Sequence, residues 1–257
     1  MSEAPSLLSI DSAIATLTLN RPQAMNAMNA AMRHLLLEQI RQIELDKTVR
    51  VLIVNANGRG FCAGADLMEG TPTSAEDELL ASFGPVINGL RKLDKVVLAA
   101  VNGVVAGIGT ALVTAADLAV AADDAYMQLA FSKIALLPDG GLTWDLVRAL
   151  GYKRAYRAMI EATNISAVEL REYGIVNDVV PADQLQQYAR DWARRIALLS
   201  PIANKLTKRA LRVAQESSLE QAILYEAAQQ ERASKSADHR ESIAAFQAKR
   251  RPEFPGK

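Results

Sequence analysis

One carboxylate, Asp139, stands out among the few residues of this chain that could do chemistry. It lies in the run Ile134-Ala-Leu-Leu-Pro-Asp-Gly-Gly141, between an apolar stretch and a glycine pair. The 257 residues include only two histidines, His34 and His239, and one cysteine, Cys62. Catalysis by Ser/His/Asp or Cys/His needs a histidine beside a nucleophile, and zinc needs three or four ligands. The composition therefore favours a carboxylate as the acid or base and predicts no metal site.

Three glycine-rich loops could place backbone amides around a substrate. They are Gly60 to Asp66, Asn102 to Gly109 and Pro138 to Gly141. Small residues let the backbone approach a ligand closely, and two amides aimed at one carbonyl would form an oxyanion hole, each donor contributing about 2.7–4 kcal/mol to transition-state stabilisation. The same glycines also fit tight helix packing alone. Leu112 stands where a dinucleotide fingerprint needs its third glycine, and no Gly-Lys-Ser/Thr follows, so neither nucleotide motif is present.

The overall composition excludes several function classes. Lysine plus arginine (29) equals aspartate plus glutamate (29), and aromatic residues make up only 5%. We therefore expect no nucleic-acid groove and no attraction to an anionic membrane. The lone cysteine excludes an internal disulfide, and the first residues lack the basic and apolar segments of a signal peptide. We expect a cytoplasmic protein with no membrane span.

Periodicity predicts an α/β core followed by helices. Residues 7–19 form a predicted hairpin, and buried strands are predicted at 51–54, 96–101, 118–121 and 127–130. Predicted helices over the same region cover 26–45, 75–93 and 107–115. Further helices are predicted at 143–149, 153–162 and 167–173, the last opening with the capping box Ser166-Ala-Val-Glu169. Three more helices are predicted from Ala182 onward. The division expected is a core of residues 1–199 and a helical oligomerisation region of residues 200–257, whose apolar faces need a partner.

Four segments together resemble the crotonase, or enoyl-CoA hydratase/isomerase, superfamily, and the resemblance extends over nearly the whole chain. They are Asn20-Arg-Pro-Gln-Ala-Met-Asn-Ala27, Phe61-Cys-Ala-Gly-Ala-Asp-Leu67, Val101-Asn-Gly-Val-Val-Ala-Gly-Ile-Gly109 and Leu137-Pro-Asp-Gly-Gly141. The resemblance implies an α/β, crotonase/ClpP-like spiral of ββα units with a C-terminal helical trimerisation region. It also implies a homotrimer, or a homohexamer built as a dimer of trimers. The implied substrate is an acyl-CoA thioester, with coenzyme A entering as part of the substrate and no separate cofactor.

By motif position, the resemblance assigns the oxyanion-hole amides to Ala65 and Ile108. Isoleucine replaces a common glycine at the second position, so its side chain should narrow the pocket. The positions implied to line the CoA or substrate site are Ala24, Met25, Ala63, Asp66, Leu67, Phe131, Phe246 and Lys249. Of these, Phe246 and Lys249 resemble a C-terminal pair that often meets CoA from a neighbouring subunit.

The departures from the superfamily pattern are informative. Hydratases of this superfamily use two glutamates, and their positions here hold Ala111 and Phe131, neither of which can transfer a proton. A positioned acid or base contributes about 10²–10⁴ in rate, so efficient hydration is disfavoured. Asp139 instead matches the position from which some isomerases of the superfamily present an aspartate. Apolar neighbours such as Leu136 and Leu137 should raise its pKa toward that of a useful base.

The favoured prediction is an enoyl-CoA isomerase in which Asp139 alone moves a proton from C2 to C4. Alternatives are a hydratase, C–C hydrolysis or decarboxylation through the same enolate, and a non-catalytic acyl-CoA-binding scaffold in which Asp139 is only a turn residue or helix cap. A dehalogenase would need a histidine in the oxyanion loop, which is absent. The segment from Met68 to Phe83, with Ile108 and Phe131, is expected to shape the acyl pocket.

The remaining polar candidates are expected to play no part in catalysis. Asp66 is expected to be structural or part of the CoA pocket, and Cys62 to fill the core. Both histidines are expected at the surface or in packing. The other acidic residues are expected to be solvated: Glu69, Glu76, Asp77, Glu78, Asp145 and Glu161.

Overall fold

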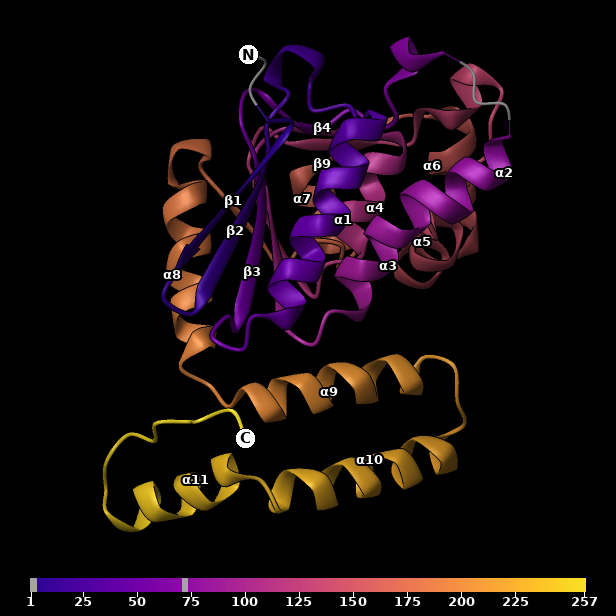
Figure 1. Ribbon diagram of the computed structural model, residues 1–257. Helices are drawn as coiled ribbons and strands as arrows, with labels where there is room; N and C mark the ends of the chain where they lie inside the picture. The colour runs from indigo at the N-terminus through magenta and orange to yellow at the C-terminus, as the bar shows by residue number, and fades with distance from the viewer. Residues whose placement is uncertain (1–3, 71–73) are drawn as a thin grey trace.

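The computed structural model describes residues 4–70 and 74–257, and its strands form two sheets (Figure 1). The larger sheet has the order β1-β2-β3-β5-β7-β10. Its first pair is the predicted antiparallel hairpin, and all its other pairs are parallel. The predicted α/β class with a mostly parallel sheet is therefore confirmed. The strands are β1 (Ser6–Asp11), β2 (Ile14–Leu19), β3 (Val51–Ala56), β5 (Val96–Val101), β7 (Leu118–Ala122) and β10 (Asp178–Val180).

The smaller sheet consists of four strands of three residues each, in the order β4-β6-β8-β9. They are β4 (Gly60–Cys62), β6 (Val104–Ala106), β8 (Tyr126–Gln128) and β9 (Asn164–Ser166). Three of them follow a strand of the larger sheet within a few residues, so each ββα unit gives one strand to each sheet. The sequence analysis assigned the residues of β4 and β6 to glycine-rich loops, and this prediction is wrong, because both segments are short strands. The strand predicted at 127–130 also ends early, because a 3₁₀ turn begins at Ala130.

Helices cover both faces of the larger sheet (Figure 1). On one face, α1 (Ala30–Leu45) packs against α3 (Gly84–Lys92), where a Cβ on Gly89 would lie 3.2 Å from Ile40 Cγ2. On the other face, α8 (Leu185–Ala197) contacts β2, β3, β5 and β7. The first helix begins four residues later than predicted. Met25 and Asn26 are left-handed, with φ of 51° and 56°, and Asn29 then caps the helix by accepting from the Met32 N–H.

The helix predicted over 75–93 is interrupted by a π turn. It consists of α2 (Ala75–Glu78), a π turn at Leu79–Phe83 and α3. Gly84 is required there, because a Cβ on it would lie 2.7 Å from the Leu79 carbonyl oxygen. Single π turns inside helices occur often at functional sites.

The four helices between Thr110 and Glu172 lie close to the ranges predicted for them. Ser166 and Glu169 form the predicted capping box, and the helix ends before Gly174, whose φ is 72°. These helices are α4 (Thr110–Thr114), α5 (Leu142–Leu150), α6 (Tyr152–Glu161) and α7 (Ala167–Glu172). Among the described residues, no helix is both long enough and apolar enough to cross a membrane.

The last three helices lie apart from the sheets, below them in Figure 1: α9 (Pro201–Ala214), α10 (Leu219–Ser234) and α11 (Ala237–Gln247). With α8 this makes four helices after Ala182, where three were predicted, because Ser236 caps a further helix. An ion pair between the buried Lys208 and the partly exposed Asp117 ties α9 to the core: Lys208 Nζ lies 2.6 Å from Asp117 Oδ2 and donates to the Lys95 carbonyl. Large apolar side chains remain exposed on this region, including Leu211, Leu219, Ile223, Leu224, Ile243 and Phe246.

Candidate active site

The turn that carries Asp139 is held directly against α4. Gly140 and Gly141 both have left-handed backbones, with φ of 63° and 87°, and they reverse the chain into α5. The Leu142 N–H donates to the Asp139 carbonyl at 3.0 Å, which closes the turn. A Cβ on Gly140 would lie only 2.8 Å from Ala111 Cβ and 3.2 Å from Ile108 Cγ1. The turn therefore rests on α4 and on the end of the second glycine-rich loop, which directly precedes that helix.

Asp139 is a partly buried carboxylate with little to stabilise its charge. Its Oδ1 atom is buried and has no hydrogen-bond partner within the part of the chain that the structure describes. Burial raises the pKa of Asp139 from its ordinary value of 3.8 to about 6. A carboxylate with such a pKa is still ionised at neutral pH and is a stronger base than a solvated one.

The other two glycine-rich loops lie side by side. A Cβ on Gly64 would lie 3.0 Å from the Ala106 carbonyl oxygen and 3.5 Å from Gly107 Cα. Glycine is needed at residue 64 for this approach, and its φ of 103° is also one that other residues rarely adopt. The next residue in each loop, Ala65 and Ile108, is thereby brought to one place.

Within residues 4–70 and 74–257, no protein acceptor is found for the N–H of Ala65 or of Ile108. The Met28 N–H donates to the Gly64 carbonyl, and the Asp66 N–H donates to the Met28 carbonyl. This parallel bridge leaves the N–H of Ala65 on the side away from Met28. Ile108 lies in the first turn of a short helical segment, Gly107–Gly109, where amides have no acceptor within the helix. Two free amides in neighbouring loops can stabilise a developing oxyanion.

The two positions that would hold hydratase glutamates are apolar and buried. Ala111 is fully buried beneath Gly140, and Phe131 is 4% exposed in the 3₁₀ turn Ala130–Ile134. Asp139 thus lies on the turn that packs against α4, next to Gly140.

Some of the implied CoA-lining residues lie together near the oxyanion loops. The Ala63 N–H donates to the Met25 carbonyl, which joins the segment around Ala24 and Met25 to the first loop. Leu67 follows Asp66 and is 66% exposed, so it is open to a ligand.

Phe246 and Lys249 are not brought to this site within one chain. Phe246 is 84% exposed on α11, and Lys249 follows that helix with a φ of 52°. Figure 1 places α11 on the far side of α9 from the sheets. These two residues therefore lie apart from the site of their own chain.

Asp66 is engaged in structural contacts. Its Oδ2 lies 2.7 Å from Arg21 Nη1, and its Oδ1 accepts from the Met68 N–H. The hydrogen bond from Arg21 lowers the pKa of Asp66, which makes it a poor proton acceptor. This agrees with the structural role expected for Asp66.

The remaining candidates do not gather at the site. Burial raises the pKa of the Cys62 thiol to about 12, so Cys62 fills the core as predicted. His34 and His239 are exposed, as expected. The described residues contain no group of His, Cys, Asp and Glu that could hold a metal ion.

The acidic residues predicted to be solvated include some that are not. Asp145 accepts two hydrogen bonds from Arg91, and its side chain is only 11% exposed. Glu78 lies 2.9 Å from the buried Arg33, and Glu69 accepts from the Ala30 N–H at the start of α1. Sequence patterns could not predict these pairs, because the partners come from distant parts of the chain. By contrast, Glu76, Asp77 and Glu161 are exposed as predicted.

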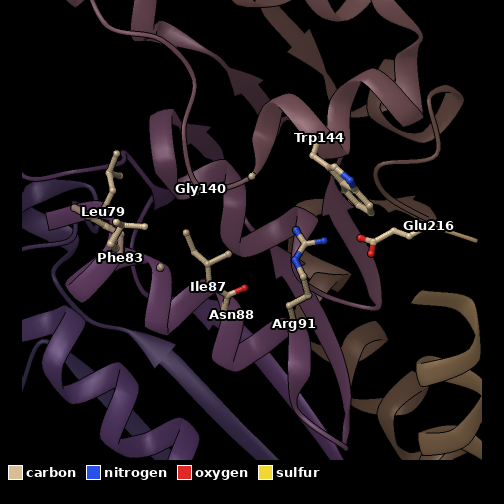
Figure 2. A pocket seen from close by; sticks show the side chains of 11 residues that line it. Leu79, Phe83, Ile87, Asn88, Arg91, Gly140, Trp144 and Glu216 are labelled. Atoms are coloured by element: carbon tan, nitrogen blue, oxygen red, sulfur yellow. The ribbon is translucent and has the colours of Figure 1, made fainter. Parts of the chain in front are cut away.

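A cavity of about 430 Å³ lies beside the Asp139 turn (Figure 2). Gly140 and Gly141 form part of its wall, and Leu79, Leu80 and Phe83 line it as expected for the predicted acyl-pocket segment. Met68, from the same segment, is 93% exposed and does not line it, and residues 71–73 lie outside the described residues. Ile108 and Phe131, which were also expected to shape the acyl pocket, do not line it either. The sequence prediction missed the other lining residues, which are Gly84, Ile87, Asn88, Arg91, Trp144 and Glu216.

Comparison with known proteins gives the family. Residues 9–257 match the family described as enoyl-CoA hydratase/isomerase. The chain belongs to this family. Its members act on acyl-CoA thioesters, and the superfamily resemblance expected from the motifs is confirmed.

Individual relatives include an isomerase and a hydratase. The chain is 39% identical over 254 residues to 1,2-epoxyphenylacetyl-CoA isomerase of Escherichia coli, covering 96% of this chain and 97% of that protein. It is 34% identical to 2,3-dehydroadipyl-CoA hydratase of the same organism, covering 94% of each. The crystal structure of an enoyl-CoA hydratase from Bacillus anthracis matches with a TM-score of 0.94 and 30% identity, covering 98% of this chain and all of that one. The crotonase fold is therefore established, while relatedness alone leaves the reaction open between the two classes.

Proposed function

We propose that this protein is an enoyl-CoA isomerase that shifts a double bond with one carboxylate, Asp139. The observation that carries the proposal is the buried Oδ1 of Asp139, which has no hydrogen-bond partner among the described residues and lies on the turn whose Gly140 packs against Ala111. A hydratase of this family would need two proton-transferring side chains, and Ala111 and Phe131 supply none. The relative named 1,2-epoxyphenylacetyl-CoA isomerase, which is 39% identical, supports an isomerase rather than a hydratase.

The proposed reaction begins with a 3-enoyl thioester. Ionised Asp139 removes a proton from C2, and the electron pair of that C–H bond moves toward the thioester oxygen to give a dienolate. The amides of Ala65 and Ile108 hold the oxyanion, each contributing about 2.7–4 kcal/mol. Asp139 then returns the proton to C4, and the double bond moves from C3–C4 to C2–C3. The carboxylate ends in its starting state, so no further acid, base or cofactor is needed.

The apolar surroundings of Asp139 support both steps. Ile87, Ile108 and Ala111 surround the turn, and they keep its environment poor in groups that could activate water. Exclusion of water protects the dienolate from competing protonation. It also keeps the pKa of Asp139 high enough for proton removal.

The proposal is tested with the Asp139→Asn variant and a panel of two substrates. Wild-type protein is expected to convert 3-enoyl-CoA to the conjugated 2-enoyl-CoA and to hydrate 2-enoyl-CoA negligibly. Asp139→Asn should lose about 10²–10⁴ of the isomerisation rate. Asp124→Asn is the matched control, because Asp124 lies exposed in the turn before β8. Full isomerase turnover by Asp139→Asn, or hydration as the main wild-type activity, would overturn the proposal.

We also propose that the protein works as a homotrimer or as a dimer of trimers. The exposed apolar side chains of α10 and α11 support this, because a single chain leaves them in water. In such an assembly, Phe246 and Lys249 of one copy would contact CoA bound mainly by Ala24, Met25, Ala63, Asp66 and Leu67 of another. Light scattering of the wild type and of Phe246→Ala, together with their KM values for acyl-CoA, tests both points. A monomeric wild type with full activity would contradict them.

A further inference from the structure

The cavity beside Asp139 has two chemically different sides. Leu79, Phe83 and Ile87 form one side, and Arg91 and Glu216 lie at the other, as Figure 2 shows. Gly140 lies between the two sides in that view. A ligand in this cavity therefore meets hydrocarbon on one side and hydrogen-bonding groups on the other.

Helix α3 produces this division through its residue spacing. Gly84, Ile87, Asn88 and Arg91 are spaced i, i+3, i+4 and i+7, so they share one face of the helix, and all four line the cavity. The wall changes from apolar to polar within one helical turn, about 5.4 Å. Ile87 also lies against the Asp139 turn, 3.0 Å from where a Cβ on Gly140 would be. The polar side chains of α3 are thus one turn from the proposed reaction centre.

Arg91 is held in place and still has hydrogen-bond donors to offer. Its Nη1 and Nη2 atoms each donate to one oxygen of Asp145, which fixes the guanidinium. A guanidinium carries five N–H groups, so three remain. Nη2 also lies 3.9 Å from where a Cβ on Gly141 would be, which places it beside the turn. The side chains of Asn88 and Trp144 can donate further hydrogen bonds from the same side.

The charged side chains on the polar side of the cavity disfavour a carboxylate on the acyl group of the ligand. Among the residues that line the first cavity, Arg91 is already paired with Asp145, and Glu216 carries a negative charge. An anionic group on the ligand would be repelled by Glu216 and would compete with Asp145 for Arg91. A neutral oxygen can accept hydrogen bonds from Arg91 or Asn88 without this penalty.

The polar side also has room beyond it. A second cavity, of about 670 Å³, lies between α3, α5 and α9 and shares Asn88, Arg91, Trp144 and Glu216 with the first. A substituent on the acyl group can therefore project past Arg91 without meeting a closed wall.

From these observations we infer that the cavity selects an acyl group that is mainly hydrocarbon and carries a neutral oxygen on its distal part, such as a hydroxyl, carbonyl or ether. The oxygen accepts hydrogen bonds from Asn88 and Arg91, while the hydrocarbon packs on Leu79, Phe83 and Ile87. This inference rests on the proposed isomerase function and names the substrate class of the same site.

The test compares three 3-enoyl-CoA substrates of equal chain length, ending in a methyl group, a hydroxyl or a carboxylate. Wild-type protein should prefer the hydroxyl over the methyl substrate by about five- to tenfold in kcat/KM, the effect of one net hydrogen bond. The carboxylate substrate should be the poorest of the three. Asn88→Leu should reduce the hydroxyl preference severalfold, because it removes a hydrogen bond that the methyl substrate cannot accept. Glu216→Gln should improve turnover of the carboxylate substrate severalfold.

Gln184→Leu is the matched control, because it makes the same kind of change at an exposed residue that lines neither cavity. It should leave all three ratios unchanged. Equal kcat/KM for the methyl and hydroxyl substrates in the wild type would overturn the inference, as would an unchanged preference in Asn88→Leu. Failure of the proposed function looks different, because then none of the three substrates would be isomerised in an Asp139-dependent way.

Discussion

Replacing Asp139 by asparagine should make the protein slower and, above neutral pH, more stable. Burial raises the pKa of Asp139 from 3.8 to about 6, so the folded protein holds this proton more tightly than the unfolded chain does. The stability that the protonated carboxyl contributes is complete below pH 3.8 and is lost as the pH rises through about 6. Asparagine has no charge to desolvate, so its contribution does not change over this range.

The size of the effect follows from the pKa. A rise of this size corresponds to about 3 kcal/mol for a fully buried group. Because Asp139 is partly exposed, solvent screening reduces this to about 1 kcal/mol. For a chain of this length, 1 kcal/mol corresponds to about 2–4 °C in Tm.

Thermal unfolding at pH 8 and at pH 4, at one protein concentration, measures the difference between the two proteins. Asp139→Asn should have the higher Tm at pH 8, and its advantage should shrink at pH 4. In parallel, kcat/KM of the wild type should fall as the pH drops below about 6, where Asp139 becomes protonated. A lower Tm for the variant at pH 8, or wild-type activity that stays constant down to pH 4, would refute this account of Asp139.

Three further predictions follow from close contacts in the core. Gly140→Ala should cost about 1–3 kcal/mol and most of the activity, since the new Cβ would lie 2.8 Å from Ala111 Cβ on a left-handed backbone; wild-type stability and kcat in this variant would count against the packing described. Cys62, fully buried with a pKa of about 12, should react with a thiol reagent only after unfolding, and rapid labelling of the native protein would contradict its place in the core. Lys208→Met should cost about 1–3 kcal/mol, because it removes the nearer of the two cations beside Asp117 and leaves Arg212, 3.7 Å away; chemical denaturation measures this, and an unchanged midpoint would show that the pair does not stabilise the docking of α9.

Local signals in the sequence predicted the local parts of the fold well. The hairpin around Asp11 and Ser12 and the capping box from Ser166 to Glu169 each depend on residues close together in the chain, and both are present. The strands β4 and β6 were missed because three residues are too few to show a period, and their pairing joins segments more than 40 residues apart. The π turn at Leu79–Phe83 has no periodic signature either.

The candidate site shows the same difference between local signals, which could be predicted, and contacts between distant residues, which could not. Asp139 was found from composition, because few other residues could do its chemistry. The pairing of Asp145 with Arg91 was missed, since it joins residues 54 positions apart. The spacing of Ile87, Asn88 and Arg91 on α3 is a local signal that could have pointed to the cavity wall. This spacing could be assigned to a cavity wall only after the structure placed that face of α3 beside the Asp139 turn.

The close packing of the glycine-rich loops separates two kinds of evolutionary change in this protein. A Cβ on Gly109 would lie 2.7 Å from the Cys62 carbonyl, and one on Gly64 would lie 3.0 Å from the Ala106 carbonyl. Since backbone blocks almost any substitution at these positions, directed evolution should leave them untouched. The wall formed by the π turn and α3 consists of side chains that can be exchanged one at a time. A library restricted to that wall could therefore change which acyl group is accepted while the loops that hold the thioester stay as they are.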